Sequence, residues 1–79
     1  MALVPNIYQE HLAGVKFITS LRNGIGVIKH VNCDMNGVPV GILTENFPYH
    51  IDAILIEYDG VEYHPIDYLR KIGVYKHDI

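Results

Sequence analysis

Three turn dipeptides constrain this chain more than any other feature of its sequence. Asn23-Gly24, Asn36-Gly37 and Asp59-Gly60 each stand between runs that are rich in Val, Ile and aromatic residues. A two-residue type I′ turn needs positive φ at both central positions, and Asn-Gly and Asp-Gly adopt it readily. The first dipeptide therefore predicts a turn, and the other two predict tight β-hairpins.

The runs between these turns predict five short antiparallel strands, since β-branched and aromatic residues fit a pleated surface. Gly26 lies inside the second run and indicates a bulge or a close approach of two backbones. Residues 44–50 are expected to form a loop fixed by Pro48, and Pro65 is expected to end the last strand before a short helical turn over residues 66–72. The expected strands are residues 15–19, 25–33, 38–43, 51–58 and 61–64.

The 79 residues are expected to form one domain. Residues 1–13 predict an N-terminal helix or arm, with Pro5 in its first turn and Gly14 ending it. Residues 14–72 would form the sheet structure and residues 73–79 a tail. The predicted fold class is mostly β: a small five-stranded, SH3-like barrel with a short N-terminal helix. The alternative is an open antiparallel sheet that the helix covers.

Charge is distributed unevenly along the chain, although the formal net charge is only −3. No Lys or Arg occurs between Lys29 and Arg70, while that stretch holds seven carboxylates. Because affinity for duplex nucleic acid rests largely on Lys and Arg, the sequence argues against strong nucleic-acid binding. The apolar runs are far shorter than a membrane span, so no membrane segment is expected.

The residues that could carry chemistry are few and scattered. Cys33 is the single cysteine, which excludes an internal disulfide and favours a reducing, cytoplasmic setting. The five histidines lack the spacing of a metal site, so no metal or cofactor is expected. His50 and His64 each stand beside a Tyr and a Pro, and a shared site remains open. With no convincing catalytic cluster, the chain is not expected to be an enzyme.

Two segments contain short glycine and tyrosine motifs: GIGVIKHV at residues 24–31 and ILIEYDGVEYHPIDYL at residues 54–69. Together they resemble the Tudor-like, RNA-polymerase-interacting module of CarD-type regulators and transcription-repair coupling factors. In that family a G-x-G strand opens a barrel and a later Tyr-, Gly- and Pro-containing hairpin closes it. The resemblance implies a barrel and a partner in the transcription machinery. The matching positions are Gly24, Gly26, Tyr58, Gly60, Tyr63 and Pro65.

The last hairpin and the segment after it carry the predicted binding surface. Exposed tyrosines beside carboxylates suit a protein partner rich in Arg, because Arg stacks on rings and pairs with carboxylates. Strand alternation places Glu57 and Glu62 outward. The predicted partner-binding residues are Glu57, Asp59, Glu62, Tyr63, His64, Asp67 and Tyr68.

The expected function is that of a small non-catalytic regulatory or adaptor protein. Its expected partner is another protein, with RNA polymerase as the one that the resemblance implies. A phage-encoded or other mobile-element origin would fit a free-standing domain of this size. The alternative is a structural protein that assembles into a homo-oligomer, since small domains gain stability from association.

Overall fold

The computed structural model describes residues 6–21 and 24–77. Within these residues the chain is mostly β, as the sequence predicts, with seven strands, two short α-helices and one 3-10 turn. The strands are β1 (Lys16–Thr19), β2 (Ile25–Val27), β3 (His30–Cys33), β4 (Pro39–Leu43), β5 (Pro48–His50), β6 (Ile54–Tyr58) and β7 (Val61–Tyr63). The helices are α1 (Gln9–Leu12) and α2 (Pro65–Lys71), and the 3-10 turn η1 spans Ile51–Ala53.

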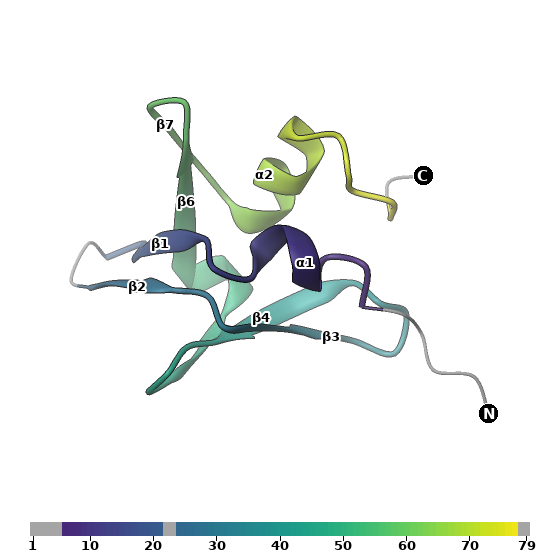
Figure 1. The fold of residues 1–79 in the computed structure, drawn as a ribbon, viewed down its shortest axis with the longest axis horizontal. Coiled ribbons are helices and arrows are strands. Elements are labelled where there is room, and N and C mark those ends of the chain that lie inside the picture. Colours follow the sequence, from purple (N-terminus) through teal and green to yellow (C-terminus); the bar gives the residue numbers. More distant parts are fainter. Residues whose placement is uncertain (1–5, 22–23, 78–79) are drawn as a thin grey trace.

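The strands form two antiparallel sheets rather than one closed barrel. The four-stranded sheet has the order β2-β1-β6-β7, and the three-stranded sheet has the order β3-β4-β5. The predicted five-stranded barrel is therefore not what the described residues form. Figure 1 shows the two sheets meeting where β2 runs into β3, with both helices to the right of β1 and β6.

The predicted strand over residues 25–33 is wrong as one element, because the chain changes sheets in its middle. Ile28 donates its N–H to the carbonyl of Val15 at the end of the β1–β2 ladder. The next residue, Lys29, donates instead to the carbonyl of Leu43 beside β4. Ile28 is fully buried at this junction, so its side chain holds the crossing point in the core.

The predicted loop over residues 44–50 is also only half correct. The Thr44 hydroxyl donates to the Phe47 carbonyl and accepts from the Phe47 N–H, which closes a tight turn. Pro48 then opens β5, a position that Pro tolerates because it is the first residue of an edge strand. Of the predicted strand over residues 51–58, the first part is the 3-10 turn and only β6 is extended.

The Asp59-Gly60 hairpin has the predicted geometry, with φ of 55° and 80° at its two central residues. The hairpin at Asn36-Gly37 exists, but its predicted type I′ turn is wrong because only Gly37 has positive φ. The Asp34 carboxylate accepts from the N–H groups of Asn36 and Val38, which fixes a different turn. Asn23 lies outside the described residues.

The predicted N-terminal helix shrinks to the single turn α1, and residues 1–5 with Pro5 lie outside the described chain. Gly14 follows it with a φ of +84°, a conformation that favours glycine, as predicted. The predicted helical turn near residues 66–72 is the full helix α2, which starts at Pro65. Neither described helix has the length and apolar character needed to cross a membrane.

The core lies between the two sheets and under the helices. Tyr8 belongs to it, and its hydroxyl accepts from the Lys76 N–H at 2.8 Å and contacts Nδ1 of His77 at 2.6 Å. Nε2 of His77 in turn reaches the Asn36 carbonyl at 2.9 Å. The segment after α2 is therefore fastened to the start of the chain. The fully buried aliphatic residues of the core are Leu12, Ile28, Val31, Ile42, Ile54, Ile56 and Leu69.

Candidate functional site

The seven residues predicted to bind a partner lie on β6, β7 and the start of α2, but they do not share one face. Glu57 and Glu62 face each other directly across the β6–β7 ladder. Tyr63 is opposite the fully buried Ile56, so it points toward the inner side of the sheet. Asp59 occupies the hairpin turn between these faces. The β6–β7 hairpin thus separates carboxylates on its outer face from ring surfaces on its inner face.

The remaining predicted residues make contacts within the fold. The Tyr68 ring meets the Tyr58 ring edge-on, with centroids 5.7 Å apart. Asp67 forms an ion pair of 2.8 Å with Arg70 one turn later in α2. His64 contacts Asp52, as described below. These contacts tie Tyr68, Asp67 and His64 to α2 and to the residues around it.

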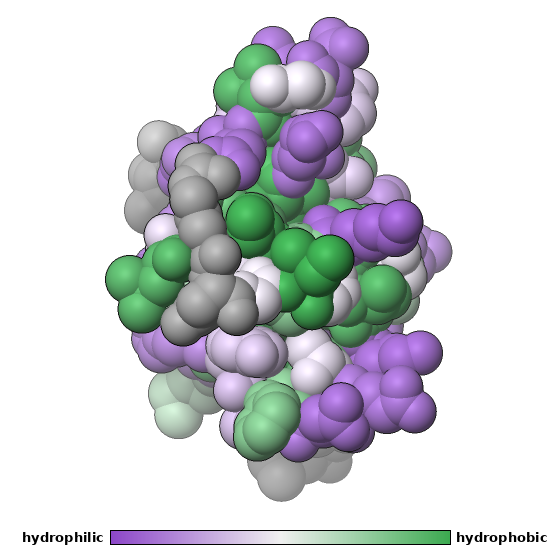
Figure 2. All heavy atoms as spheres, turned by 90° about the vertical axis from the view of Figure 1, so that its left-hand side faces the viewer, coloured by the Kyte–Doolittle hydropathy of each residue, from purple (hydrophilic) through white to green (hydrophobic). Residues whose placement is uncertain are grey.

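The outer face of the four-stranded sheet carries an apolar row that the sequence analysis did not single out. Register places Ile25 opposite Ile18, and Ile18 opposite Leu55. The Ile25 side chain is 84% exposed, although it sits in a strand. Figure 2 faces this side and shows apolar side chains across the middle, with hydrophilic ones above and below them. A lone exposed isoleucine is ordinary, whereas a row across three strands suggests a contact surface.

A charged row runs beside the apolar one. Lys16 precedes Ile18 by two residues and Glu57 follows Leu55 by two, so both project from the same face, next to Glu62. A shallow hollow of about 330 Å³ lies among these strands, and its walls include Lys16, Glu57 and Glu62. Like charges directly opposite each other destabilise a ladder. The Glu57–Glu62 pair therefore makes this end of the face suited to a cation.

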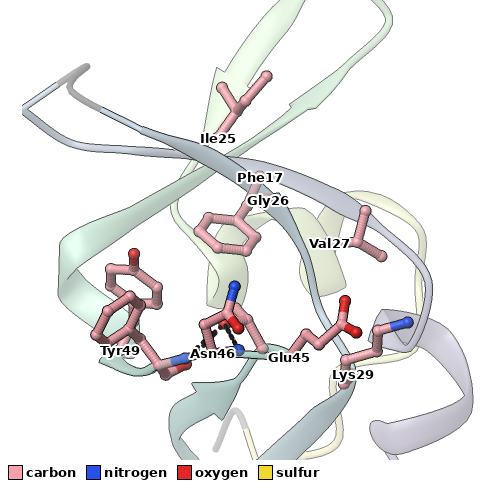
Figure 3. A pocket seen from close by; sticks show the side chains of 10 residues that line it. Phe17, Ile25, Gly26, Val27, Lys29, Glu45, Asn46 and Tyr49 are labelled. Atoms are coloured by element: carbon pink, nitrogen blue, oxygen red, sulfur yellow. Dashed lines mark hydrogen bonds between the residues drawn. The ribbon is translucent and has the colours of Figure 1, made fainter.

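A second and larger pocket, of about 430 Å³, separates β2 from the turn between β4 and β5. Its floor is made by Phe17 and Tyr49, whose rings meet edge-on with centroids 5.4 Å apart. Phe47, on the pocket wall, is 62% exposed. Figure 3 shows Lys29 and Glu45 toward the same end of this pocket. None of these three aromatic residues is among the predicted partner-binding residues.

Gly26 is the residue that lets this pocket reach the aromatic floor. A Cβ at this position would lie only 2.9 Å from the Phe17 ring. Gly26 therefore marks a close approach, but the neighbouring group is the Phe17 side chain rather than a second backbone. The same glycine keeps β2 thin between the two hollows, since Ile25, Gly26 and Val27 line both.

His50 and His64, whose relation the sequence left open, are joined by Asp52. Nε2 of His64 lies 2.6 Å from one Asp52 oxygen, and Nδ1 of His50 lies 3.5 Å from the other. His64 Nδ1 accepts from the Ile66 N–H and caps α2, so its proton belongs on Nε2, which donates to Asp52. This hydrogen bond lowers the pKa of the Asp52 carboxyl, with the nearby histidine charges assisting against partial desolvation.

This cluster supports the fold by capping two short helical elements. His50 Nδ1 accepts from the Asp52 N–H at 3.2 Å and so caps the 3-10 turn. With both Nδ1 atoms engaged as caps, the two rings hold the starts of η1 and α2. Within residues 6–21 and 24–77, no group of three His, Cys, Asp or Glu side chains could hold a metal ion.

Cys33 lies half-buried at the end of β3 as a free thiol. Its Sγ is 3.5 Å from Oδ1 of Asn6. Burial raises the pKa of this thiol, and the negative charge of Asp34 raises it further. Because the thiolate is the reactive form, Cys33 is a poor nucleophile here.

Comparison of this chain with protein-family models, with curated proteins and with solved structures found no match.

Proposed function

We propose that this chain is a non-catalytic regulatory or adaptor protein that binds another protein through the outer face of its four-stranded sheet. The observation that carries the proposal is the row Ile25–Ile18–Leu55 on one sheet face beside Glu57 and Glu62, in which Ile25 is exposed and the other two residues are half-buried. Protein interfaces commonly combine an apolar centre with a charged rim. The partner would present apolar side chains next to Arg or Lys.

The partner class within the cell rests on the resemblance alone. A relation to SH3-like or Tudor-like modules, and RNA polymerase as the partner, are parts of the same proposal. The positions that support them are Gly26 in β2 and Tyr58 and Gly60 in the β6–β7 hairpin. Charge complementarity of this kind acts mainly on the association rate, so binding should weaken as salt rises.

The double change Glu57→Lys with Glu62→Lys tests the proposal by partner capture from extract of the source cells, followed by mass spectrometry. Both side chains are exposed, so the fold should survive with a stability change within about 0.5 kcal/mol. Capture of the partner should fall strongly. The control is Glu10→Lys, which reverses an exposed carboxylate on α1, outside the sheet. Equal capture by the wild type and the first double variant would refute the proposal.

Homo-oligomeric assembly is the second candidate, because the same face carries charges of both signs. Lys16 of one copy could meet the carboxylates of Glu57 and Glu62 of another. Light scattering during gel filtration separates the two: a concentration-dependent dimer or ring that the double variant abolishes would favour assembly.

A further inference from the structure

The free edge of β2 offers main-chain groups for another strand. In the β1–β2 ladder, Thr19 donates to the Gly24 carbonyl, and Ile28 donates to the Val15 carbonyl. Hydrogen-bonded pairs alternate along an antiparallel ladder, so Gly24, Gly26 and Ile28 are the residues that turn toward β1. The N–H and C=O groups of Ile25 and Val27 consequently point away from β1. These two residues stand at the edge of the sheet.

This edge opens onto the 430 Å³ pocket rather than onto flat surface. A strand added beside β2 would place the side chain opposite Gly26 on the inner side, over the Phe17 ring. The Phe17 ring already lies over Gly26, where an added Cβ would come within 2.9 Å of it. A large apolar group at that position would therefore lie on this ring, in the space that Phe47 and Tyr49 also line. The pocket volume falls in the range that protein pockets use for small ligands.

A second copy of this chain fits the pocket poorly. Symmetric pairing of two β2 strands about Gly26 would put glycine opposite glycine and leave the pocket empty. Pairing about Ile25 would bring Gly24 to that position, and pairing about Val27 would bring the buried Ile28. None of these registers supplies an available large side chain, so the occupant comes from a different polypeptide.

The charges around the pocket further limit the kind of segment that could bind there. Glu45 stands on the wall opposite β2, toward the Lys29 end of the pocket. In an added antiparallel strand, the residue two positions before the one opposite Gly26 points inward at that end. A basic side chain there would meet the Glu45 carboxylate and compete for it with the Lys29 ammonium, which lines the same end of the pocket.

We propose that an extended segment of a partner protein adds as an antiparallel strand to the open edge of β2, with an aromatic side chain in the pocket and a basic residue two positions before it. This proposal rests on the proposed function only in taking the ligand to be a polypeptide. Strand addition draws affinity from main-chain hydrogen bonds and specificity from alternate side chains.

The probe is the acetylated and amidated peptide Ser-Lys-Val-Phe-Val-Thr-Ser, labelled for fluorescence anisotropy. In the proposed register its two Val residues face Ile25 and Val27, and their N–H groups bond to β2. The Phe N–H points away. Methylation of either Val nitrogen should therefore weaken binding at least tenfold, while methylation of the Phe nitrogen is the matched control and should leave it nearly unchanged.

On the protein side, Val27→Pro removes one edge N–H without removing a bond to β1, and Val27→Thr keeps that N–H. Binding should fall at least tenfold in Val27→Pro and persist in Val27→Thr. Glu45→Gln should weaken the peptide a few-fold and reduce the salt dependence of binding. Amide exchange at Ile25 and Val27 should slow when the peptide is bound.

Several results would overturn the proposal. These are no saturable binding at millimolar peptide, equal binding of all methylated peptides, or exchange protection at β7 in place of β2. Protection of Ile25 and Val27 in a dimer without peptide would assign the edge to a second copy instead. Peptide binding that survives Glu57→Lys with Glu62→Lys, while partner capture survives too, would refute the sheet-face proposal and leave this one standing.

Discussion

The edge strands β2 and β3 differ in whether side chains cover their outward main-chain groups. At β3, Gln9 Oε1 accepts from the Val31 N–H at 2.8 Å, and its Nε2 donates to the Lys29 carbonyl. Asn6 Nδ2 donates to the Val31 carbonyl at 2.8 Å. At β2, the outward groups of Ile25 and Val27 face a pocket. Two side-chain amides thus lie where a neighbouring strand would be at one edge, and no side chain among the described residues is seen to do the same at the other.

The difference shows that this small chain does not protect its edges uniformly. Unprotected edges invite pairing with other chains, so proteins usually block them. Here the single turn α1 is placed where its first residue covers β3, which also seals the core around Leu12 and Val31. Of these two edges, the open one lies beside an aromatic pocket, and this combination makes β2 a candidate place for recognition.

The largest expected effect comes from removing the floor beneath the open edge. Phe17→Ala should destabilise the protein by about 3–5 kcal/mol, the usual cost of deleting a buried aromatic ring. Phe17 is 4% exposed and contacts Tyr49, so the change leaves a cavity between the sheets. Urea unfolding measures it, and Phe17→Leu is the control that should lose much less. A loss below about 1 kcal/mol would mean that Phe17 is not the support of β2.

Opening the closed edge should have the next largest effect. Gln9→Ala strips both hydrogen bonds from β3 and should cost about 1–3 kcal/mol, because the part-buried Val31 N–H loses its partner. The variant should also self-associate at high concentration through the exposed edge. Gln9→Glu keeps the acceptor for Val31 and should cost less. Unchanged exchange of the Val31 amide in Gln9→Ala would contradict the account of this edge.

A proline at the open edge should have only a small effect on stability. Val27→Pro removes an N–H that bonds to nothing in β1, and edge strands are where sheets tolerate Pro. We expect the free energy of unfolding, measured with urea, to fall by less than about 1 kcal/mol, which is within the range of ordinary surface changes. A loss as large as that of Gln9→Ala would show that Val27 donates within the fold and that β2 is not open as described.

The smallest expected effect is that of acid, which should weaken the contacts of Asp52 but not those at the β3 edge. The hydrogen bond from His64 lowers the folded-state pKa of Asp52, so its stabilisation is present above the unfolded value of about 3.9 and fades as pH falls through the lower folded value. The amides at β3 do not titrate. Stability differences between wild type and Asp52→Asn should thus shrink from pH 5 to below pH 3, while differences for Gln9→Ala persist. A constant Asp52→Asn difference across that range would contradict this.

Local patterns predicted much of the fold. Asp59-Gly60 gave the hairpin turn, and Gly14 marked the end of the N-terminal helix, because both depend on the conformational freedom of one or two residues. The alternation in β6 correctly put Ile54 and Ile56 inside and Glu57 outside. These features need only neighbours in sequence.

The features that were missed depend on distant contacts. Residues 25–33 are uniformly β-rich, and only pairing with β1 and then with β4 divides them between sheets. Asp34 decided the turn type at Asn36-Gly37 through a carboxylate two residues away. For the site, Glu57 and Glu62 were found as outward residues, but the row through Ile18 and Ile25 required strand register. No local sequence pattern predicts which strands will be neighbours.

The bond network around Tyr8 also bears on the order in which the chain folds. Tyr8 and His77 are 69 positions apart, and β1 pairs with β6 across about half of the chain. Contacts of such long range form slowly, since a large loop must close first. The β3-β4-β5 meander needs only close neighbours and should form early. During synthesis α1 and β1 must wait for β6 and for the segment after α2, so a newly made chain exposes Tyr8 until Lys76 and His77 have emerged.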